Sequence, residues 1–311
     1  LPAGTPAGAR FTDHLVESAA PAARPGARRG WTVLGTEDHP LSRGVAEHFP
    51  LADTPDARLL LLPPGLTVPA ELVVTALRAT AADGLPLVVL HHGGVGAAVG
   101  RSIAMERPGA AVMVVETPVD DRCLKLVAEA SVDWTGYVEA VYDEDGVRTT
   151  RVAAPLALSR RDERIPLAPG DVLLVTGGAK GIGLECAAAL CQATGATAML
   201  FGRSPVTDPE VRAGLDRLAA LGITAAYHAV DVTDRAAVTA AVAAVQDRHG
   251  PVRGLLHAAG HNTPRRIEDV TVEGLRATLA PKADGFDHLV AASATICASP
   301  SPSDPSSAAP A

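Results

Sequence analysis

A glycine-rich turn placed directly after an apolar strand is the feature that most constrains this chain. The apolar run Asp171–Val175 predicts a buried strand, and the turn after it opens a predicted helix running to about Thr194. Glycine permits the tight turn at Gly177, and the later glycines let backbone and helix approach a pyrophosphate closely. The free N–H groups and positive dipole end of the helix favour phosphate. This context predicts a dinucleotide-binding βαβ unit and disfavours the alternative, a plain strand–helix turn. The turn reads Thr176, Gly177, Gly178, Ala179, Lys180, Gly181, Ile182, Gly183.

The end of the second strand of this unit indicates which dinucleotide binds. A unit that binds NAD has an acidic residue there, which holds the ribose 2′-hydroxyl. Here the strand ends Phe201-Gly202-Arg203-Ser204, without a carboxylate. Arg203 is placed to pair with a 2′-phosphate, and Lys180 adds a second positive charge. For both side chains the alternative is a solvent-facing cation. Two cations and no acid predict NADPH.

The next two strand ends supply the remaining candidate cofactor-binding residues. Asp231 follows the third strand, where an aspartate accepts a hydrogen bond from the adenine amino group. The fourth strand ends His257-Ala258-Ala259-Gly260, whose small residues let the nicotinamide half lie against the backbone. The candidates added to the glycine loop are Arg203, Ser204, Asp231, Val232, Ala258, Ala259 and Gly260.

Strands and helices alternate along both halves of the chain. This pattern predicts the α/β class, with two Rossmann-like parallel-sheet subdomains in tandem, the second incomplete. The expected divisions are a disordered linker at 1–29, a structural subdomain without cofactor at 30–160, the NADPH-binding subdomain at 165–292 and a disordered tail at 293–311. The predicted strands of the first half are Trp31–Leu34, Arg58–Leu62, Leu87–Leu90, Ala111–Val115, Tyr137–Tyr142 and Val147–Ala153, the last two joined by a hairpin turn at Asp143–Gly146. The predicted strands of the second half after the first are Ala198–Phe201, Ala225–Ala229 and Gly254–His257. The predicted helices are Pro69–Ala82, Cys123–Ala130, Pro209–Leu221 and Arg235–His249.

Composition and spacing argue against several other functions. The net charge of −8 and the lack of a basic face disfavour nucleic acid as a partner. No apolar run reaches the roughly 18 residues of a membrane span. The four cysteines lack the spacing of a zinc site or a disulfide scaffold, so we expect a cytoplasmic protein. The adjacent His91 and His92 point to opposite faces of a strand, which disfavours a metal site. A second glycine-rich run, Gly93–Gly100, follows a later strand and is not expected to bind a cofactor.

Several motifs resemble known families. In their order, TGGAKGIG, FGRS, DVTD and LHAAG resemble the short-chain dehydrogenase/reductase superfamily. SIAMERPG and GVRTTRVAAPLAL resemble the structural subdomain of ketoreductase domains from type I polyketide synthases. HNTP followed by TLAPKADGFDHL is most similar to the iterative enediyne-type branch. The resemblance covers roughly residues 30–292. It implies NADPH-dependent reduction of β-ketoacyl intermediates bound to an acyl carrier protein, with that protein and other synthase domains as partners.

The resemblance also implies catalytic residues, of which this chain carries one. Lys282 matches the family's lysine, whose implied role is to orient cofactor or substrate and to ease proton donation by a tyrosine; the alternative is a solvated helix lysine. The family's serine and tyrosine follow a few tens of residues later. Here Tyr137, Tyr142 and Tyr227 all precede Lys282. We therefore expect a C-terminally truncated chain that keeps the cofactor fold but lacks turnover. The alternatives are a non-catalytic structural or docking module, or the product of a truncated or frameshifted reading frame.

Overall fold

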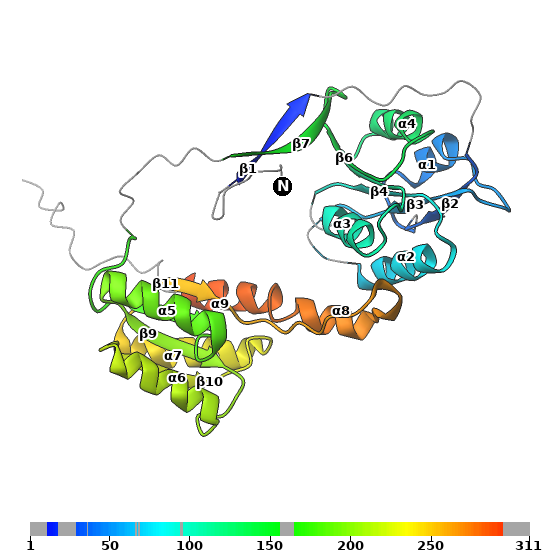
Figure 1. Cartoon of the computed structure of the whole chain (residues 1–311). Coiled ribbons are helices and arrows are strands. Elements are labelled where there is room, and N and C mark those ends of the chain that lie inside the picture. The colour runs from blue at the N-terminus through cyan, green and yellow to red at the C-terminus, as the bar shows by residue number, and fades with distance from the viewer. Residues whose placement is uncertain are drawn as a thin grey trace, which may run out of the picture. The chain divides into compact units, whose positions relative to one another are not determined.

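The chain forms two compact units (Figure 1), each described here by itself. The computed structural model describes residues 11–17, 29–35, 37–65, 67, 69–93, 96–155 and 165–294. Unit 1 contains the described residues up to 155 together with Pro264–Val272, and unit 2 contains the other described residues from 165 onward. Pro264–Val272 therefore groups with unit 1, whereas the division expected from the sequence assigned it to the second subdomain. The expected tail from residue 295 and most of the expected linker lie outside the described residues.

Within the described residues, unit 1 is built on a seven-stranded sheet of order β1-β7-β6-β5-β4-β3-β2. Strands β2 to β6 run parallel, while β7 pairs antiparallel with β6 and β1 antiparallel with β7. The middle strands are continuous apolar runs because helices cover both faces of a parallel sheet. The strands are β1 (Phe11–Glu17), β2 (Trp31–Leu34), β3 (Ala57–Leu61), β4 (Leu87–His91), β5 (Val112–Glu116), β6 (Tyr137–Tyr142) and β7 (Arg148–Pro155).

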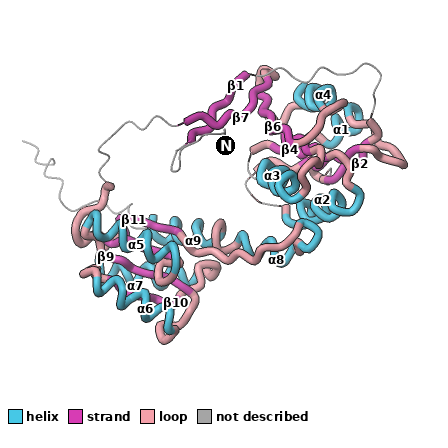
Figure 2. The backbone as a smooth tube through the Cα atoms, viewed as in Figure 1, coloured by secondary structure: helices cyan, strands magenta, loops and turns pink. Residues whose placement is uncertain are grey.

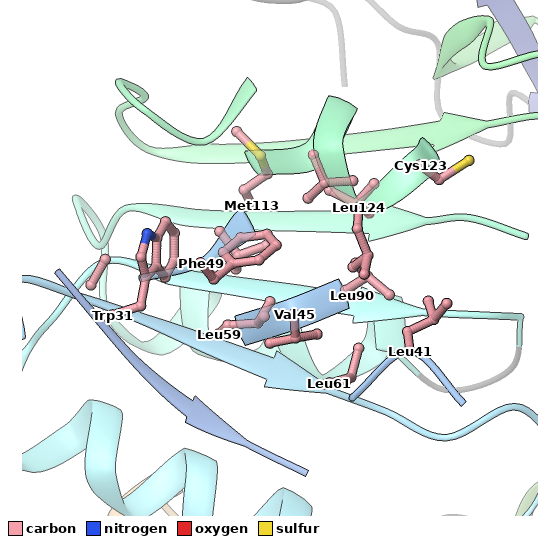
Figure 3. Packing of buried hydrophobic residues seen from close by; sticks show 14 of the residues in the cluster. Trp31, Leu41, Val45, Phe49, Leu59, Leu61, Leu90, Met113, Cys123 and Leu124 are labelled. Carbon is pink, nitrogen blue, oxygen red and sulfur yellow. The ribbon is translucent and has the colours of Figure 1, made fainter. Parts of the chain in front are cut away.

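The helices of unit 1 pack in two pairs, α1 with α4 and α2 with α3 (Figures 1 and 2). Figure 3 shows the core beneath α1 and α4, where Val45 and Phe49 pack on Leu59, Leu61 and other strand residues. This continuous apolar layer is the main source of stability of the unit. The helices are α1 (Ser42–His48), α2 (Ala70–Asp83), α3 (Gly96–Glu106), α4 (Asp121–Ala130) and the short 3-10 helix η1 (Ile267–Asp269).

Four elements of unit 1 were not predicted from the sequence, namely β1, α1, α3 and the short η1. Strand β1 lies inside the expected linker, and its pairing partner β7 is far away along the chain. Helix α1 has only seven residues and no side-chain cap. Helix α3 begins within the second glycine-rich run, where a Cβ at Gly96 would collide with the His91 ring and one at Gly100 with Val114. The glycines of that run therefore allow the helix to pack closely on the sheet.

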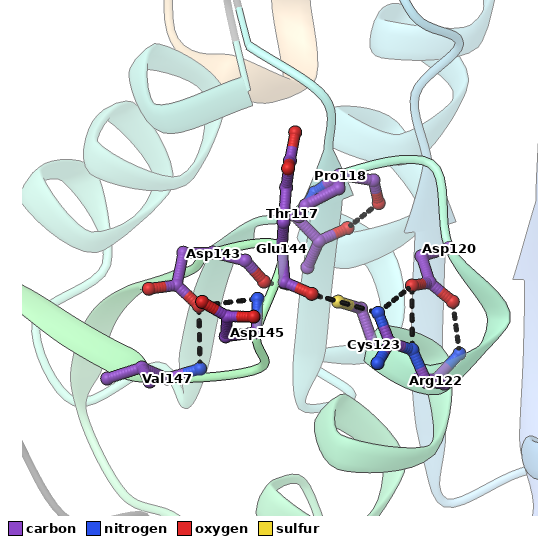
Figure 4. A network of polar contacts seen from close by, with 9 residues as sticks. All are labelled: Thr117, Pro118, Asp120, Arg122, Cys123, Asp143, Glu144, Asp145 and Val147. Atoms are coloured by element: carbon purple, nitrogen blue, oxygen red, sulfur yellow. Dashed lines mark hydrogen bonds and ion pairs between the residues drawn. The ribbon is translucent and has the colours of Figure 1, made fainter.

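The predicted hairpin turn between β6 and β7 is confirmed, and its polar contacts reach α4 (Figure 4). Asp143 accepts hydrogen bonds from the backbone N–H groups of Asp145 and Val147, at 3.0 and 2.8 Å. Arg122 donates to the carbonyl oxygen of Glu144 at 2.9 Å and to the carboxylate of Asp120, which caps α4. These bonds tie the hairpin to the first turn of the helix.

Within the described residues, unit 2 is a four-stranded parallel sheet of order β10-β9-β8-β11. Leu173 and Val175 of β8 point to the face covered by α5 and α6, and Val172 and Leu174 to the face covered by α7 and α9. The α/β, Rossmann-like fold class predicted from the sequence is therefore confirmed. The elements are β8 (Val172–Thr176), α5 (Gly181–Thr194), β9 (Thr197–Gly202), α6 (Pro209–Ala220), β10 (Ala225–Ala229), α7 (Arg235–His249), β11 (Val252–His257), α8 (Val272–Leu279) and α9 (Asp284–Ala294).

Candidate functional site

The carboxyl ends of the four strands of unit 2 meet at one edge of the sheet. β8, the first strand along the chain, lies between β9 and β11, so the order reverses beside it; ligands of such sheets bind at this switch point. A cavity of about 590 Å³ lies there, lined by residues that follow all four strands and by Ala277, Ala280 and Pro281. The cavity brings together Gly177, Arg203, Asp231, Val232, Ala258, Ala259 and Gly260 of the sequence-predicted residues.

The glycine loop has the close contacts that its sequence suggests. Gly177 has a φ of +65°, and a Cβ there would lie 2.7 Å from the carbonyl oxygen of Ala258. A Cβ on Gly183 would collide with the carbonyl oxygen of Gly177, and one on Gly178 with Val175. Gly181 has a φ of +52° and open space around it. The loop therefore requires glycine for two different reasons, packing and backbone conformation.

Helix α5 starts at this loop without a side-chain cap. Lys180 occupies the N-cap position in an extended conformation, and no side chain of the described residues bonds the first-turn N–H groups. These groups remain available to a ligand, and the helix dipole makes an anion the favoured one. The Ile182 side chain is exposed on this first turn.

Thr176 acts inside the protein rather than at the cavity surface. Its side chain is fully buried, and its hydroxyl accepts the N–H groups of Ala258 and Ala259 at 3.2 and 3.1 Å. The hydroxyl has one proton, which it donates to Nδ1 of His257 at 2.8 Å. Nε2–H of His257 in turn donates to the carbonyl oxygen of Pro281 at 2.9 Å. This chain of bonds joins β8 and β11 to the segment before α9 and positions two walls of the cavity.

Asp231 and Val232 occupy the wall formed after β10. Oδ1 of Asp231 accepts the backbone N–H of Thr233 at 2.9 Å and its hydroxyl at 2.8 Å, which lowers the pKa of the carboxyl group and keeps it ionised. Val232 is buried, and its carbonyl oxygen accepts a hydrogen bond from His288 of α9 at 3.0 Å. Asp231 thus presents a fixed, charged acceptor beside the cavity.

The two predicted phosphate-binding cations have different surroundings. Arg203 is exposed and lines both the main cavity and a neighbouring hollow of about 360 Å³. The hollow is also lined by Lys180 and Ser204. Nζ of Lys180 donates to Glu210, Asp208 and Ser204, and the hydrogen bonds to Glu210 and Asp208 raise the pKa of the lysine. The positive charge expected of Lys180 is therefore already neutralised within the protein, because two carboxylates bind it.

Lys282 directly follows Pro281, which lines the cavity, and its side chain lies beside Gly260. The Cε atom of Lys282 is 3.4 Å from the position that a Cβ on Gly260 would occupy. The carbonyl oxygen of its neighbour Pro281 accepts the hydrogen bond from His257. In unit 2 the tyrosine is Tyr227, whose hydroxyl donates to the carbonyl oxygen of Ser204 at 2.6 Å. This phenol lines the smaller hollow, and the residues lining the main cavity include no tyrosine.

The histidines of unit 1 belong to its own structure. Nδ1 of His39 accepts the N–H of Leu41 at 3.1 Å, so its Nε2–H donates to the carbonyl oxygen of Leu62 at 3.2 Å. Burial lowers the pKa of His39, His91 and His92. Among the described residues, no three histidine, cysteine, aspartate or glutamate side chains are grouped to bind a metal ion.

Several residues of the site escaped the sequence analysis. His257 was quoted only as part of a strand end, and its bond to Pro281 joins residues 24 positions apart. Asp208 and Glu210 flank a proline in a pattern typical of a helix start, which does not reveal their ion pairs with Lys180. Only the N-cap role of Asp208 carries a local signal.

Comparisons with known proteins agree with this architecture. The model of the KR domain family matches residues 171–299. Erythronolide synthase EryA3 of Saccharopolyspora erythraea is 32% identical over 176 residues, which are 55% of this chain and 5% of that protein. The 5-methyl-1-naphthoate synthase of Streptomyces sahachiroi is 31% identical over 203 residues, 60% of this chain and 11% of that protein. The chain thus spans about a tenth or less of these relatives.

Solved ketoreductase structures share the fold of the chain. An A-type ketoreductase from a modular polyketide synthase has a TM-score of 0.75 and 22% identity, covering 93% of this chain and 73% of that one. The ketoreductase from the first module of phoslactomycin biosynthesis in Streptomyces sp. HK803 has a TM-score of 0.73 and 24% identity, covering 91% and 69%. In the described residues of the present chain, no helix is long and apolar enough to span a membrane. The family model thus identifies residues 171–299 of the chain as a KR domain, and the fold of the chain is shared with ketoreductases of polyketide synthases.

Proposed function

We propose that this chain is the cofactor-binding part of an NADPH-dependent β-ketoacyl reductase acting on intermediates bound to an acyl carrier protein. KR domains of the short-chain dehydrogenase/reductase superfamily bind a nicotinamide cofactor. The observation that carries the proposal is the cavity at the strand switch point, where the glycine loop, Arg203 and Asp231 converge and beside which Lys282 lies. Other polyketide synthase domains, the acyl carrier protein among them, are the proposed partners.

The residues present fit a dinucleotide. The uncapped α5 N-terminus and the glycine loop would hold the pyrophosphate, Asp231 the adenine amino group, and Arg203 the 2′-phosphate. Ala258, Ala259 and Gly260 leave room for the nicotinamide against the backbone. When bound, the cofactor supplies a hydride. Lys282 would bind the ribose or the substrate next to Gly260 and would add a positive charge near a developing alkoxide.

Proton donation is the step for which the described lining of the cavity offers no tyrosine. Tyr227 donates its proton to the Ser204 carbonyl and lies in the smaller hollow, and no tyrosine follows it in the sequence. Without a general acid, reduction of a ketone lacks a rate factor of about 10²–10⁴. We therefore propose that this polypeptide alone binds NADPH and does not turn over.

The same observation favours a second candidate, a structural or docking module that has kept the fold. Cofactor binding separates the two, because a scaffold has no need of a working 2′-phosphate site. A broken reading frame is tested separately: a serine- and tyrosine-bearing continuation in another frame of the downstream DNA would establish it, and its absence would exclude it.

The test is calorimetric titration of the full chain with NADPH and with NADH, followed by an assay of NADPH oxidation with trans-1-decalone. We expect binding that is selective for NADPH and no oxidation above the rate of the buffer. Steady oxidation would refute the predicted inactivity. A folded chain that binds neither nucleotide would refute the cofactor site and leave the scaffold as the explanation.

A further inference from the structure

The ammonium group of Lys180 has a complete set of partners inside the protein. Its three N–H groups match three acceptors: Glu210 Oε2 at 2.9 Å, Asp208 Oδ2 at 3.0 Å and Ser204 Oγ at 3.2 Å. A phosphate that approaches Lys180 therefore finds no free donor. It also meets a cluster with a net charge of −1, because two carboxylates surround one ammonium.

The two carboxylates differ in how firmly they are held. Asp208 caps α6, where its Oδ1 accepts the N–H groups of Glu210 and Val211 at 2.9 and 3.2 Å, and its side chain is 25% exposed. The Glu210 side chain is 78% exposed, and among the described residues its carboxylate bonds to Lys180. Glu210 is thus the partner that a competing anion would displace.

The hollow of about 360 Å³ beside this cluster has Lys180 on its wall together with Arg203, Ser204 and Tyr227. We propose that Glu210 is a specificity-determining residue, which competes with the 2′-phosphate of the nucleotide for Lys180 and so weakens NADPH binding relative to NADH. This inference rests on the proposed cofactor site. NADH has a hydroxyl in place of the 2′-phosphate, so its binding is not opposed by the carboxylate. Arg203 would then provide most of the attraction for the phosphate.

Removing the charge of Glu210 makes the prediction quantitative. In Glu210→Gln, Lys180 regains a donor for the phosphate and one negative charge is lost. Because exposed ion pairs are weak, we expect the Kd of NADPH to fall by a small factor, about two- to fivefold. The Kd of NADH is expected to stay the same. The gain in NADPH affinity is expected to shrink at high salt, since the interaction is exposed and screened.

The matched control is Glu185→Gln, which removes the same charge from an exposed carboxylate on α5. Glu185 pairs with Arg217 at 2.7 Å and is not a partner of Lys180. The full chain and both variants are titrated calorimetrically with NADPH and NADH, and Glu210→Gln is repeated in a Lys180→Met background. We expect only Glu210→Gln to tighten NADPH binding, and the effect to vanish without the lysine.

Three outcomes would overturn the inference, and they are distinguishable. If the unaltered chain binds NADPH but Glu210→Gln leaves its Kd unchanged, Glu210 does not determine specificity although the cofactor site stands. If NADPH and NADH respond equally, or Glu185→Gln acts as strongly, the effect is one of general charge. If the unaltered chain binds neither nucleotide, the proposed function fails and the inference fails with it.

Discussion

Replacing Thr176 by valine tests the hydrogen-bond chain that shapes the cavity. Valine keeps the shape and the apolar contacts but has no hydroxyl. The N–H of Ala259 then loses its acceptor and Nδ1 of His257 loses its donor, whereas the N–H of Ala258 keeps the Thr176 carbonyl at 3.0 Å. An unsatisfied buried polar group costs about 1–3 kcal/mol, and both groups here are only partly buried. We expect a loss of about 2–3 kcal/mol in the free energy of unfolding of unit 2.

Thr176→Ser is the control that separates the contribution of the hydroxyl group from that of the buried methyl group. Serine keeps the hydroxyl and loses one buried methyl group, at a cost of about 1 kcal/mol. The valine variant should therefore be less stable than the serine variant, although valine is the more apolar residue. If apolar burial dominated at this site, the order would be reversed.

The assay uses the distribution of tryptophan between the units. Trp31 and Trp134 both lie in unit 1, so their fluorescence reports unit 1, while far-UV circular dichroism reports both units. In urea, we expect Thr176→Val to lower the midpoint of the unit 2 transition by roughly 1 M and to leave the tryptophan transition in place. A valine variant as stable as the serine variant would refute the proposed role of the hydroxyl.

Three further predictions concern the glycine loop, the cofactor and a buried ion pair. Gly183→Ala should abolish detectable NADPH binding in a calorimetric titration, because its Cβ would collide with the carbonyl oxygen of Gly177. Gly181→Ala has open space around its Cβ and should only weaken NADPH binding. Equal effects of the two substitutions would contradict this reasoning. Arg203→Gln should raise the Kd of NADPH about tenfold or more and leave that of NADH unchanged; an equal loss for both would refute a 2′-phosphate contact. Asp83→Asn should cost unit 1 about 1–2 kcal/mol at neutral pH, since it removes the negative charge and one of the two acceptor oxygens that face the buried Arg58 guanidinium. The expected cost is reduced because the carboxylate is 41% exposed. Hydrogen bonds from Arg58 lower the folded-state pKa of Asp83 below 3.8. The stabilisation by the Asp83 carboxylate is therefore present above that pH and is lost as the pH falls through the lowered pKa. Tryptophan-monitored unfolding at several pH values should show that the difference in unfolding free energy between the unaltered chain and Asp83→Asn shrinks only in acid.

The sequence by itself determined the strands from β2 to β11 and the switch-point loop. Parallel strands covered on both faces must be apolar throughout, so their positions are visible as continuous runs, and β4 was predicted to within one residue of the bounds that it has. The glycine loop was visible because its demands are local: a left-handed φ at Gly177 and a close contact at Gly183 each exclude a side chain. The KR domain was recognised from the same motifs, and the family model matches it over residues 171–299. The enediyne-type branch and the truncation stay predictions.

Elements that are stabilised by partners distant along the chain could not be predicted from the sequence. Strand β1 was expected to be linker. Its hydrogen bonds go to β7, whose residues lie more than a hundred positions later, so the local sequence does not reveal them. Helix α3 was not predicted because glycine is a poor helix former, and only the nearness of the sheet explains Gly96 and Gly100. Pro264–Val272 joins unit 1, where the N–H of Ile267 donates to Glu106 at 2.9 Å, a contact between residues 161 positions apart.

The same distinction holds within the site. Residue type and spacing were enough to propose Lys180 and Arg203 as phosphate-binding cations, because both follow strands whose ends meet. Only the tertiary structure decided that Lys180 is held by Asp208 and Glu210, while Arg203 lines the open cavity. It also decided that Thr176 is a buried link rather than a surface contact. The physical reason is that the sequence carries the charge of a side chain, whereas its free charge and free hydrogen bonds depend on neighbours that only folding brings within reach.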